Sequence, residues 1–326
     1  MSFKAGVSTK MLSKVLKAIH EPRKVLCYLF SMLPRKLFQD KFYIEMLFWL
    51  HMGKRLDLRN PQTFNEKLQW LKLYDRKPEY TMMVDKYKVR EYIAERLGEE
   101  YLIPLLGVWN DPDEIDFDAL PNQFVLKCNH NSGLGMCICK DKAKLDIAKV
   151  KAELRKGLKQ DYYLTGREWP YKDVERKIIA EKYMVDDGET GIRNDGKGEL
   201  TDYKLFCFNG YVDCVMVCLE RSSQETKFYF FDRSWNLLRY NIRGKNAPID
   251  FTVPKPINID EMFDIAEKLS QGLPFARIDL YSVSGKTYFG EITFFPDSGF
   301  DANLLSETDR CWGEMIVTTQ VISEVE

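Results

Sequence analysis

Two acidic residues near the carboxyl end of the chain stand where strand patterns favour apolar side chains. Asp279 and Glu291 lie in the runs FARIDLY and TYFGEITFF, joined by a tight turn at residues 283–286. A hairpin brings such strands side by side, and two buried carboxylates cost several kcal/mol each unless a cation offsets them. Arg277 shares a face with Asp279. Oxygen ligands without His or Cys favour Mg²⁺ over zinc. The set predicts phosphate and magnesium chemistry, and a hairpin with a solvated charged face is the alternative.

A polar loop is the candidate for binding phosphate. It joins the strand-like runs FVLK and MCICK, and no Gly-Lys-Ser/Thr sequence opens a helix after it, so it is not a P-loop. Lys127 ends the first strand, where its compact charge is expected to reach phosphate. An ordinary hairpin loop is the alternative. The loop residues with small side chains or backbone donors that can fold over a polyphosphate are Asn129, His130, Asn131, Ser132, Gly133 and Gly135. His130 contacts phosphate or substrate, or else orders the loop.

The run KIIAEKYMV predicts a strand that ends in an acidic, glycine-containing stretch. The backbone of such a strand end, at Glu181, Lys182 and Met184, can present an N–H and a C=O to the rim of an adenine ring. The acids that follow, Asp186 and Asp187, would then lie near ribose hydroxyls. A strand end with solvated acids is the alternative.

The elements that must position these residues are helices and antiparallel strands, which gives the fold class α+β. Thr63 and Glu66 have capping-box spacing at the start of a helix over NEKLQWLKLY. The run VDKYKVREYIAERL predicts a second helix that stops at Gly98. Asn209-Gly210 is a strong signal for a hairpin. Another hairpin is expected around residues 232–234, and further helices at about 141–158 and 260–271.

The composition is that of an ordinary globular protein. The 326 residues are 45% hydrophobic and 30% charged, with a formal net charge of −1, so no overall charge indicates nucleic acid. The eight cysteines are irregularly spaced, and Cys137 and Cys139 alternate with apolar residues as small buried side chains do. This pattern predicts reduced thiols and a cytoplasmic protein.

Residues 1–41 form a basic N-terminal arm. Nine Lys or Arg residues there accompany only Glu21 and Asp40, a net charge of +7. The apolar run at residues 25–33 is too short for the ~20 residues of a membrane span and lacks a convincing signal-peptide cleavage site. The arm either lies on the inner face of an anionic membrane or packs against the protein body.

Taken in order, these segments resemble the ATP-grasp superfamily, and above all its TupA-like branch, which is associated with teichuronopeptide and capsular polysaccharide synthesis. The resemblance lies in NPQTFNEKLQWLKLYDR, VDKYKVREYI, FVLKCNHNSG, DYKLFCFNG and RIDLY…YFGEITFFPDSG, and extends from about residue 40 to residue 315. It implies two α+β subdomains that clasp ATP after a helical N-terminal region. The expected divisions are residues 1–80, the helical region with the basic arm; 81–180, the first part of the core with the phosphate loop; and 181–326, the second subdomain with the metal site.

The resemblance also implies roles residue by residue. Arg277 resembles the arginine that steadies an acyl phosphate. The ligands of Mg²⁺ correspond to Asp279, Glu291 and the position of Thr293, where the family usually has Asn. A Thr hydroxyl is a weaker ligand for a hard cation, so the second magnesium ion is in doubt. The remaining positions implied to contact ATP are Lys86 and Lys127 on either side of the phosphates, Ser132, Gly133 and Gly135 above them, Glu181, Lys182 and Met184 at adenine, Asp187 at ribose, and Asp202 with Lys204 at phosphate.

The implied reaction is ATP-dependent ligation of a carboxylate to an amine through an acyl phosphate. The expected carboxylate is a uronic acid of a polysaccharide or its precursor, and the expected amine is an amino acid or amino sugar. The resemblance also implies that a membrane-bound arm would lie beside a polysaccharide synthesis complex. Phosphoryl transfer needs charge neutralisation and alignment more than a protein nucleophile. The alternatives are a glycosyltransferase of the same pathway, for which the sequence lacks an Asp-x-Asp strand end, and a catalytically inactive scaffold.

Overall fold

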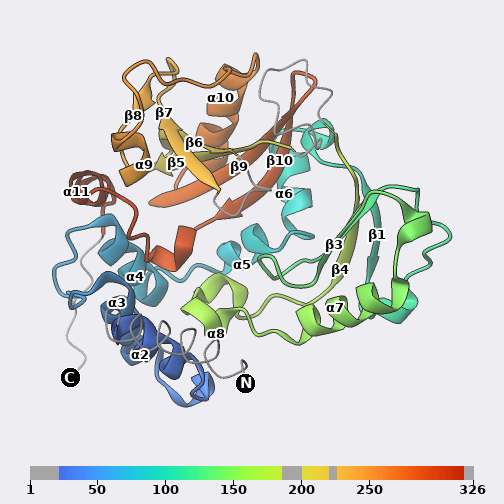
Figure 1. The fold of residues 1–326 in the computed structure, drawn as a ribbon, viewed down its shortest axis with the longest axis horizontal. Helices are drawn as coiled ribbons and strands as arrows, with labels where there is room; N and C mark the ends of the chain where they lie inside the picture. Colours follow the sequence, from blue (N-terminus) through green and yellow to red (C-terminus); the bar gives the residue numbers. More distant parts are fainter. Residues whose placement is uncertain (1–21, 186–199, 220–225, 319–326) are drawn as a thin grey trace, which may run out of the picture.

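The computed structural model describes residues 22–185, 200–219 and 226–318. Helices dominate its first part, as the sequence predicts (Figure 1). None of the helices in these ranges is both long enough and apolar enough to cross a membrane. The helices are α2 (Pro22–Ser31), α3 (Asp40–Met52), α4 (Phe64–Tyr74), α5 (Pro78–Val84) and α6 (Val89–Arg96).

The predicted capping box is present at the start of α4. The Thr63 side chain accepts a hydrogen bond from the Glu66 backbone N–H, and the Glu66 side chain accepts one from the Thr63 backbone N–H. The second predicted helix is shorter than expected, because α5 ends at Val84 and α6 begins only at Val89. The Asp85 side chain accepts from the backbone N–H groups of Tyr87 and Lys88, which holds a turn between the two helices.

The first sheet has four antiparallel strands in the order β1-β4-β2-β3. Helix α7 (Ile147–Lys159) packs against β2 and β3, and begins later than the predicted residue 141 because Asp146 caps it. The short helix α8 (Tyr163–Gly166) follows. The strands are β1 (Leu105–Trp109), β2 (Phe124–Cys128), β3 (Met136–Cys139) and β4 (Ile178–Lys182).

The second sheet has six antiparallel strands in the order β10-β9-β5-β6-β7-β8. The expected hairpin turn occurs at Asn209-Gly210, and both residues have positive φ. Helix α10 (Ile259–Ser270) packs on β5, β6 and β9. The strands are β5 (Asp202–Phe208), β6 (Tyr211–Leu219), β7 (Lys227–Phe231), β8 (Leu237–Leu238), β9 (Phe275–Val283) and β10 (Lys286–Thr293), and the other helices are α9 (Ile242–Lys245) and α11 (Ser306–Met315).

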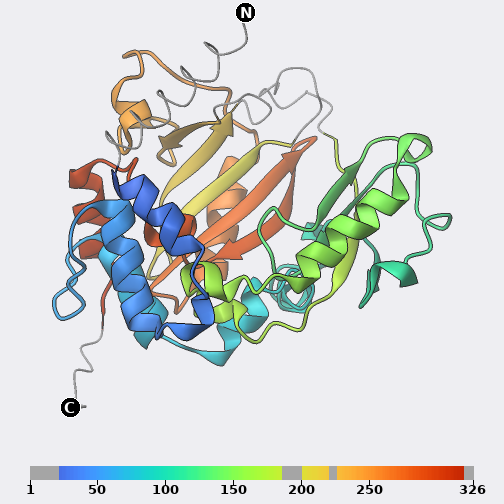
Figure 2. The same ribbon diagram turned by 60° about the horizontal axis from the view of Figure 1, so that its bottom comes forward.

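The two sheets lie on opposite sides of the molecule, with α5 and α6 between them (Figures 1 and 2). Leu205 and Ile278 belong to the buried core of the larger sheet, and the Cys207 thiol contacts the Ala266 carbonyl of α10. Because side chains alternate along a strand, Lys204 and Arg277 point to the opposite face. That face is the one that carries the candidate site.

Candidate nucleotide and metal site

A β-bulge brings the two acidic residues of the β9–β10 hairpin together. Glu291 lies directly opposite Asp279, whereas Phe289 lies opposite Leu280, so the register shifts at Gly290. With an unbroken register Glu291 would lie opposite Ile278 and face α10. A Cβ at position 290 would stand only 2.8 Å from the Asp279 carbonyl oxygen, so this close approach requires glycine. The bulge therefore places both carboxylates on one face.

Three cationic side chains neutralise these acids. Arg277 donates to both oxygens of Asp279, at 2.7 Å from Nε to Oδ1 and 2.8 Å from Nη2 to Oδ2. Lys204, opposite Asp279 on β5, hydrogen bonds to the same carboxylate and lies 3.3 Å from Asp202 Oδ2. The bidentate arginine geometry orients the Asp279 carboxylate as well as neutralising it.

Lys86 supplies the third cation, from the turn between α5 and α6. Its Nζ lies 3.3 Å from Glu291 Oε2 and donates to the Asn131 carbonyl at 2.9 Å. Its backbone N–H donates to the Asn129 carbonyl at 3.1 Å. The interruption of the predicted helix thus lets Lys86 bridge Glu291 and the polar loop, because in a continuous helix its backbone N–H would not be directed to the Asn129 carbonyl.

The charges in this group stabilise one another. Burial would raise the pKa of Glu291, but Lys86, Lys204 and Arg277 outweigh it and hold that pKa below its ordinary value. Burial would lower the pKa of both Lys204 and Arg277, yet Asp279 keeps each of them above its usual value. The Glu291 carboxylate and both cations are therefore charged at neutral pH.

The donor set fits Mg²⁺ as a partial shell. Asp279 and Glu291 offer hard oxygen atoms, and the described part of the chain has no group of three or more His, Cys, Asp or Glu side chains that would hold a metal alone. Further oxygen ligands would have to come from phosphate and water. Thr293 Oγ1 accepts from Arg277 Nη2 at 3.2 Å and donates to Glu291 Oε1 at 3.2 Å, so here the hydroxyl orders its neighbours.

The polar loop between β2 and β3 packs at one end and is open at the other. A Cβ at Gly135, where φ is +71°, would lie 2.7 Å from Cys128 Sγ and 2.8 Å from Gly157 Cα, whereas one at Gly133 would meet nothing within 4 Å. Ser132 is exposed and hydrogen bonds to Tyr162. The open segment at 132–133 is the part with room to lie over a ligand.

His130 orders this loop. Its side chain is buried, and Nε2 lies 3.1 Å from the Gln160 carbonyl oxygen. Burial lowers the pKa of His130 to about 4, helped by the charges of Arg176 and Lys86, so the ring is neutral at pH 7. Nε2 then donates to the carbonyl, which is the loop-ordering role.

The expected adenine hinge lies on the smaller sheet, where Lys127 Nζ is 2.6 Å from Glu181 Oε2. Arg90 Nη1, which the sequence did not single out, lies 3.4 Å from Glu181 Oε1. The Lys182 backbone N–H donates to the Pro104 carbonyl, while its side chain is exposed, and Met184 is half-buried. Asp187 lies outside the described residues.

Sequence reasoning missed a buried polar stripe on α4. Asn65, Gln69 and Lys72 recur at helical spacing on one face, and all three are fully buried. Gln69 donates to the carbonyls of Ser298 and Gly299 at 3.1 and 2.7 Å, and Lys72 donates to that of Ser298 at 2.7 Å. The signal that could have revealed the stripe is the set of polar residues at helical spacing within NEKLQWLK. In the structure these side chains hold the turn after β10.

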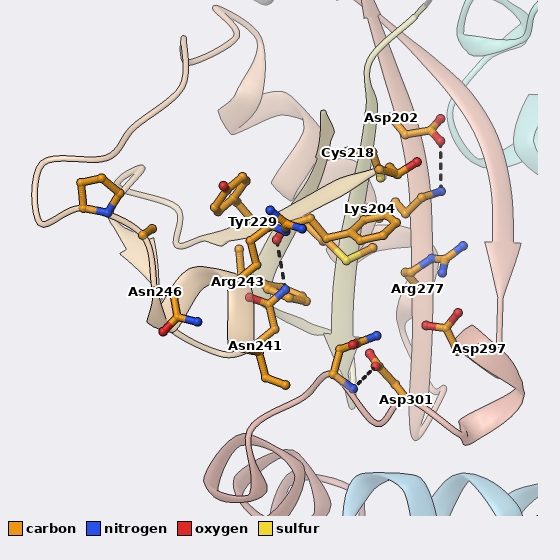
Figure 3. A pocket seen from close by; sticks show the side chains of 18 residues that line it. Asp202, Lys204, Cys218, Tyr229, Asn241, Arg243, Asn246, Arg277, Asp297 and Asp301 are labelled. Carbon is orange, nitrogen blue, oxygen red and sulfur yellow. Dashed lines mark hydrogen bonds and ion pairs between the residues drawn. The ribbon is translucent and has the colours of Figure 1, made fainter. Parts of the chain in front are cut away.

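A pocket of about 800 Å³ opens beside the cationic group (Figure 3). Lys204 and Arg277 lie at its strand wall, together with Asp202. Asp297 and Asp301, which follow β10, line it near Arg277, and the segment around α9 closes the other side (Figure 3). The pocket therefore lies next to the candidate site on the same face of the sheet, over strands β5 to β7 and away from β10.

Comparison with known proteins identifies a family. The family model described as TupA-like ATPgrasp matches residues 66–317. No curated protein matches the chain. D-alanine–D-alanine ligase from Bacillus anthracis complexed with ATP is 15% identical with a TM-score of 0.37, over 65% of this chain and 54% of that one. The same ligase from Helicobacter pylori is 13% identical with a TM-score of 0.42, over 79% and 70%.

D-cycloserine synthetase DcsG is 13% identical with a TM-score of 0.38, over 72% of this chain and 69% of that one. The chain thus spans about half the length of the Bacillus anthracis ligase. Similarity at this level does not transfer an activity, and the family match rests on the sequence.

Proposed function

Because the chain belongs to the TupA-like ATP-grasp family, we propose that it is an ATP-dependent carboxylate–amine ligase. The observation that carries the proposal is the group formed by Arg277, Asp279, Glu291, Lys204 and Lys86. Three cations and two carboxylates converge there from β5, β9, β10 and the turn before α6. Such a group can neutralise phosphate while keeping oxygen ligands for a divalent cation.

In this proposal ATP lies between the two sheets, with its phosphates toward the cations. Lys86, from the turn between α5 and α6, and Lys127, from β2 of the smaller sheet, contact them from either side, and bound Mg²⁺ would supply charge neutralisation at Asp279 and Glu291. The loop covers the phosphates with its open segment, and Lys204 with Asp202 provides the further phosphate contact. The hinge positions proposed for adenine are Glu181, Lys182 and Met184, with Asp187 proposed at ribose.

The proposed reaction has two balanced steps. A carboxylate oxygen of the substrate bonds to the γ-phosphorus while the bond to the β-phosphate bridging oxygen breaks, and ADP leaves. The nitrogen of the amine then bonds to the carbonyl carbon, the bond from that carbon to the phosphate oxygen breaks, and inorganic phosphate and a proton leave. Arg277 holds the negative charge of the acyl phosphate between the steps.

For the carboxylate we propose a uronic acid of a cell-surface polysaccharide or of its precursor. The support is the resemblance of NPQTFNEKLQWLKLYDR and RIDLY…YFGEITFFPDSG to the branch associated with teichuronopeptide synthesis. The proposed amine is an amino acid or amino sugar, and the proposed compartment is the cytoplasm.

Peripheral attachment to the membrane is proposed from the surface around α2. Basic residues accompany it, including Arg23, Lys36 and Lys41, all exposed. A basic surface with apolar side chains suits an anionic bilayer. The exposed apolar residues are Val25, Leu26, Tyr28, Leu29, Met32, Leu33, Leu37 and Phe42.

Nucleotide choice tests the proposal against its alternatives. Titration of ATP with Mg²⁺ is expected to raise the melting temperature of the protein, whereas UDP-sugars leave it unchanged. A screen of uronic acids against amines is then expected to sustain ADP release over many turnovers only with a productive pair, because a carboxylate alone supports only the first step. Stabilisation by UDP-sugars instead of ATP supports a glycosyltransferase, and stabilisation by neither supports an inactive scaffold.

A further inference from the structure

The pocket beside the cationic group differs in charge from one end to the other. Its strand wall carries Lys204 and Arg277 with Asp202 beside them, and Arg243 comes from α9. The segment after β10 contributes Asp297 and Asp301. In Figure 3 the Asp297 carboxylate lies between Arg277 and Asp301. The charge of Asp297 acts on both of these neighbours. A ligand that enters the pocket therefore meets acids directly beside Arg277.

Asp297 is the accessible member of the acidic pair. Its side chain is exposed and makes no hydrogen bond or ion pair within the described residues. Asp301 is more deeply placed, and its carboxylate accepts from the Asn303 backbone N–H at 2.8 Å. One acid is thus available to a ligand while the other is held in position.

Polar side chains of α4 hold the backbone that presents Asp297 in place. Asp297 and Ser298 have φ of +49° and +52°, a conformation that non-glycine residues adopt at a cost. Gln69 and Lys72 bind the carbonyls of Ser298 and Gly299, as described above. Asn65 Oδ1 accepts from the Asp301 backbone N–H at 2.9 Å. The acids are therefore pre-organised on a buried polar support instead of a loose loop.

We propose that this pocket binds the amine substrate, with its primary ammonium group between Asp297 and Asp301. The proposal rests on the ligase function proposed above and names the place and charge of its second substrate. A carboxylate group of the ligand is attracted to Arg277 and Lys204 at the strand wall. The acidic end of the pocket repels that carboxylate and attracts a cationic group of the ligand. The volume suits a molecule larger than a single small amino acid. Asn246, Asn303 and Tyr229 offer polar contacts along its length.

The amine must lose a proton before it can bond to carbon, and the pocket can accept it. Burial raises the pKa of Asp301 to about 6, and the charge of Asp297 adds to the effect. A carboxylate of raised pKa is a better proton acceptor than an ordinary one. Asp297 would then attract the ammonium and Asp301 would take its proton.

Calorimetry with matched amines tests the proposal on the full chain. The probes are D-glucosamine, D-galactosamine and D-alanine, each paired with its N-acetyl derivative, in which the amine is neutral. We expect at least one free amine to bind about tenfold more tightly than its acetylated partner, as a charge-assisted hydrogen bond requires. Asp297→Asn and Asp301→Asn are each expected to remove that preference while ATP affinity stays within about twofold.

The controls separate the possible failures. Asparagine tolerates positive φ, so Asp297→Asn keeps the turn, and Asp250→Asn removes an exposed carboxylate outside the pocket. No preference for any free amine, or a preference that survives both pocket variants, overturns the amine site. If wild-type protein binds ATP in the same experiment, only the amine site fails. If it binds a free amine but no ATP, the ligase proposal fails and the pocket assignment keeps its own support.

Discussion

Charge balance around Asp279 and Glu291 depends on cations from separate parts of the chain. Arg277 is local, Lys204 comes from β5, and Lys86 comes from a turn nearly two hundred residues earlier. A nucleotide that brings negative phosphates would compete for these cations and release carboxylate oxygen atoms for a metal. Ligand binding at this group therefore depends on which of these charges the ligand replaces.

Substitution of Lys127 tests whether a residue of the smaller sheet contacts the phosphates of ATP. In the described structure its ammonium pairs with Glu181 at 2.6 Å. Lys127→Ala is expected to weaken ATP binding by about ten- to a hundredfold, because a charged hydrogen bond contributes about 1.5–3 kcal/mol. AMP binding should change far less. Calorimetry with both nucleotides checks this, and Lys159→Ala, an exposed lysine of α7, is the control. Equal weakening of ATP and AMP would make Lys127 structural.

His130 predicts a specific pH dependence of stability. Its folded pKa of about 4 lies below the ordinary value near 6.5, so the unfolded chain binds more protons between these values. The contribution of neutral His130 is complete above pH 6.5 and is lost as pH falls through 4. The loss amounts to about 3 kcal/mol, at about 1.4 kcal/mol per pKa unit.

Urea unfolding of wild type and His130→Gln from pH 7 to pH 4 measures this contribution. The wild type is expected to lose more stability on acidification than the variant, because glutamine keeps a hydrogen-bond donor but does not titrate. Parallel curves for the two proteins would mean that His130 is solvated in the folded state.

At the scale of elements, α4 links the N-terminal helices to the site. Its capping box and apolar residues could be predicted from NEKLQWLKLY, and both are present. The partner of its polar stripe could not, because the turn at 297–299 is more than two hundred residues away. The spacing of residues along a helix identifies which side chains share a face. Only tertiary packing determines which other residues that face contacts.

Lys72 tests how α4 supports the turn. The ammonium is fully buried, which lowers its pKa, and its charge acts on the equally buried Glu168. Lys72→Met leaves Glu168 without this compensation and is expected to destabilise the protein by about 3–5 kcal/mol. Adding Glu168→Gln should recover part of the loss. A double-mutant cycle by chemical denaturation measures the coupling, and strictly additive effects would rule it out.

The hairpins show why part of the site was predictable. Alternation along FARIDLY placed Arg277 and Asp279 on one face, and the tight turn expected at residues 283–286 is present, with positive φ at Ser284 and Gly285. The bulge at Gly290 and the break at Asp85 carry no such periodic signal. Both arise from close backbone contacts, and both decide whether Glu291 and Lys86 reach the site.

For the whole molecule, the two sheets and the helical N-terminal region are as the resemblance to ATP-grasp proteins implied. The expected division at residues 80 and 180 remains a prediction. Of the basic arm, residues 1–21 lie outside the described part of the chain. The surface around α2 is the part of the arm on which membrane attachment can be tested.

Substitution of exposed apolar residues tests that attachment without disturbing the core. Tyr28 and Met32 are 62% and 63% exposed, so Tyr28→Asp with Met32→Asp should leave the fold intact. Binding to vesicles that contain anionic lipid is expected to fall severalfold, and wild-type binding should weaken with salt. Ile249→Asp, at a 90% exposed position far along the chain, is the control. Sedimentation that shows no vesicle binding by wild type at low salt would contradict the attachment.

We propose that ATP and Mg²⁺ meet at Asp279 and Glu291. Calorimetric titration of ATP with Mg²⁺, and again with EDTA, into wild type, Asp279→Asn and Glu291→Gln tests it most directly. We expect Mg²⁺ to tighten ATP binding by wild type and by the Asp250→Asn control at least about tenfold, about 1.4 kcal/mol. Each site variant should keep its circular dichroism spectrum but lose that enhancement, because a carboxylate ligand is gone. An enhancement that persists in either variant, or that wild type lacks, would contradict the account.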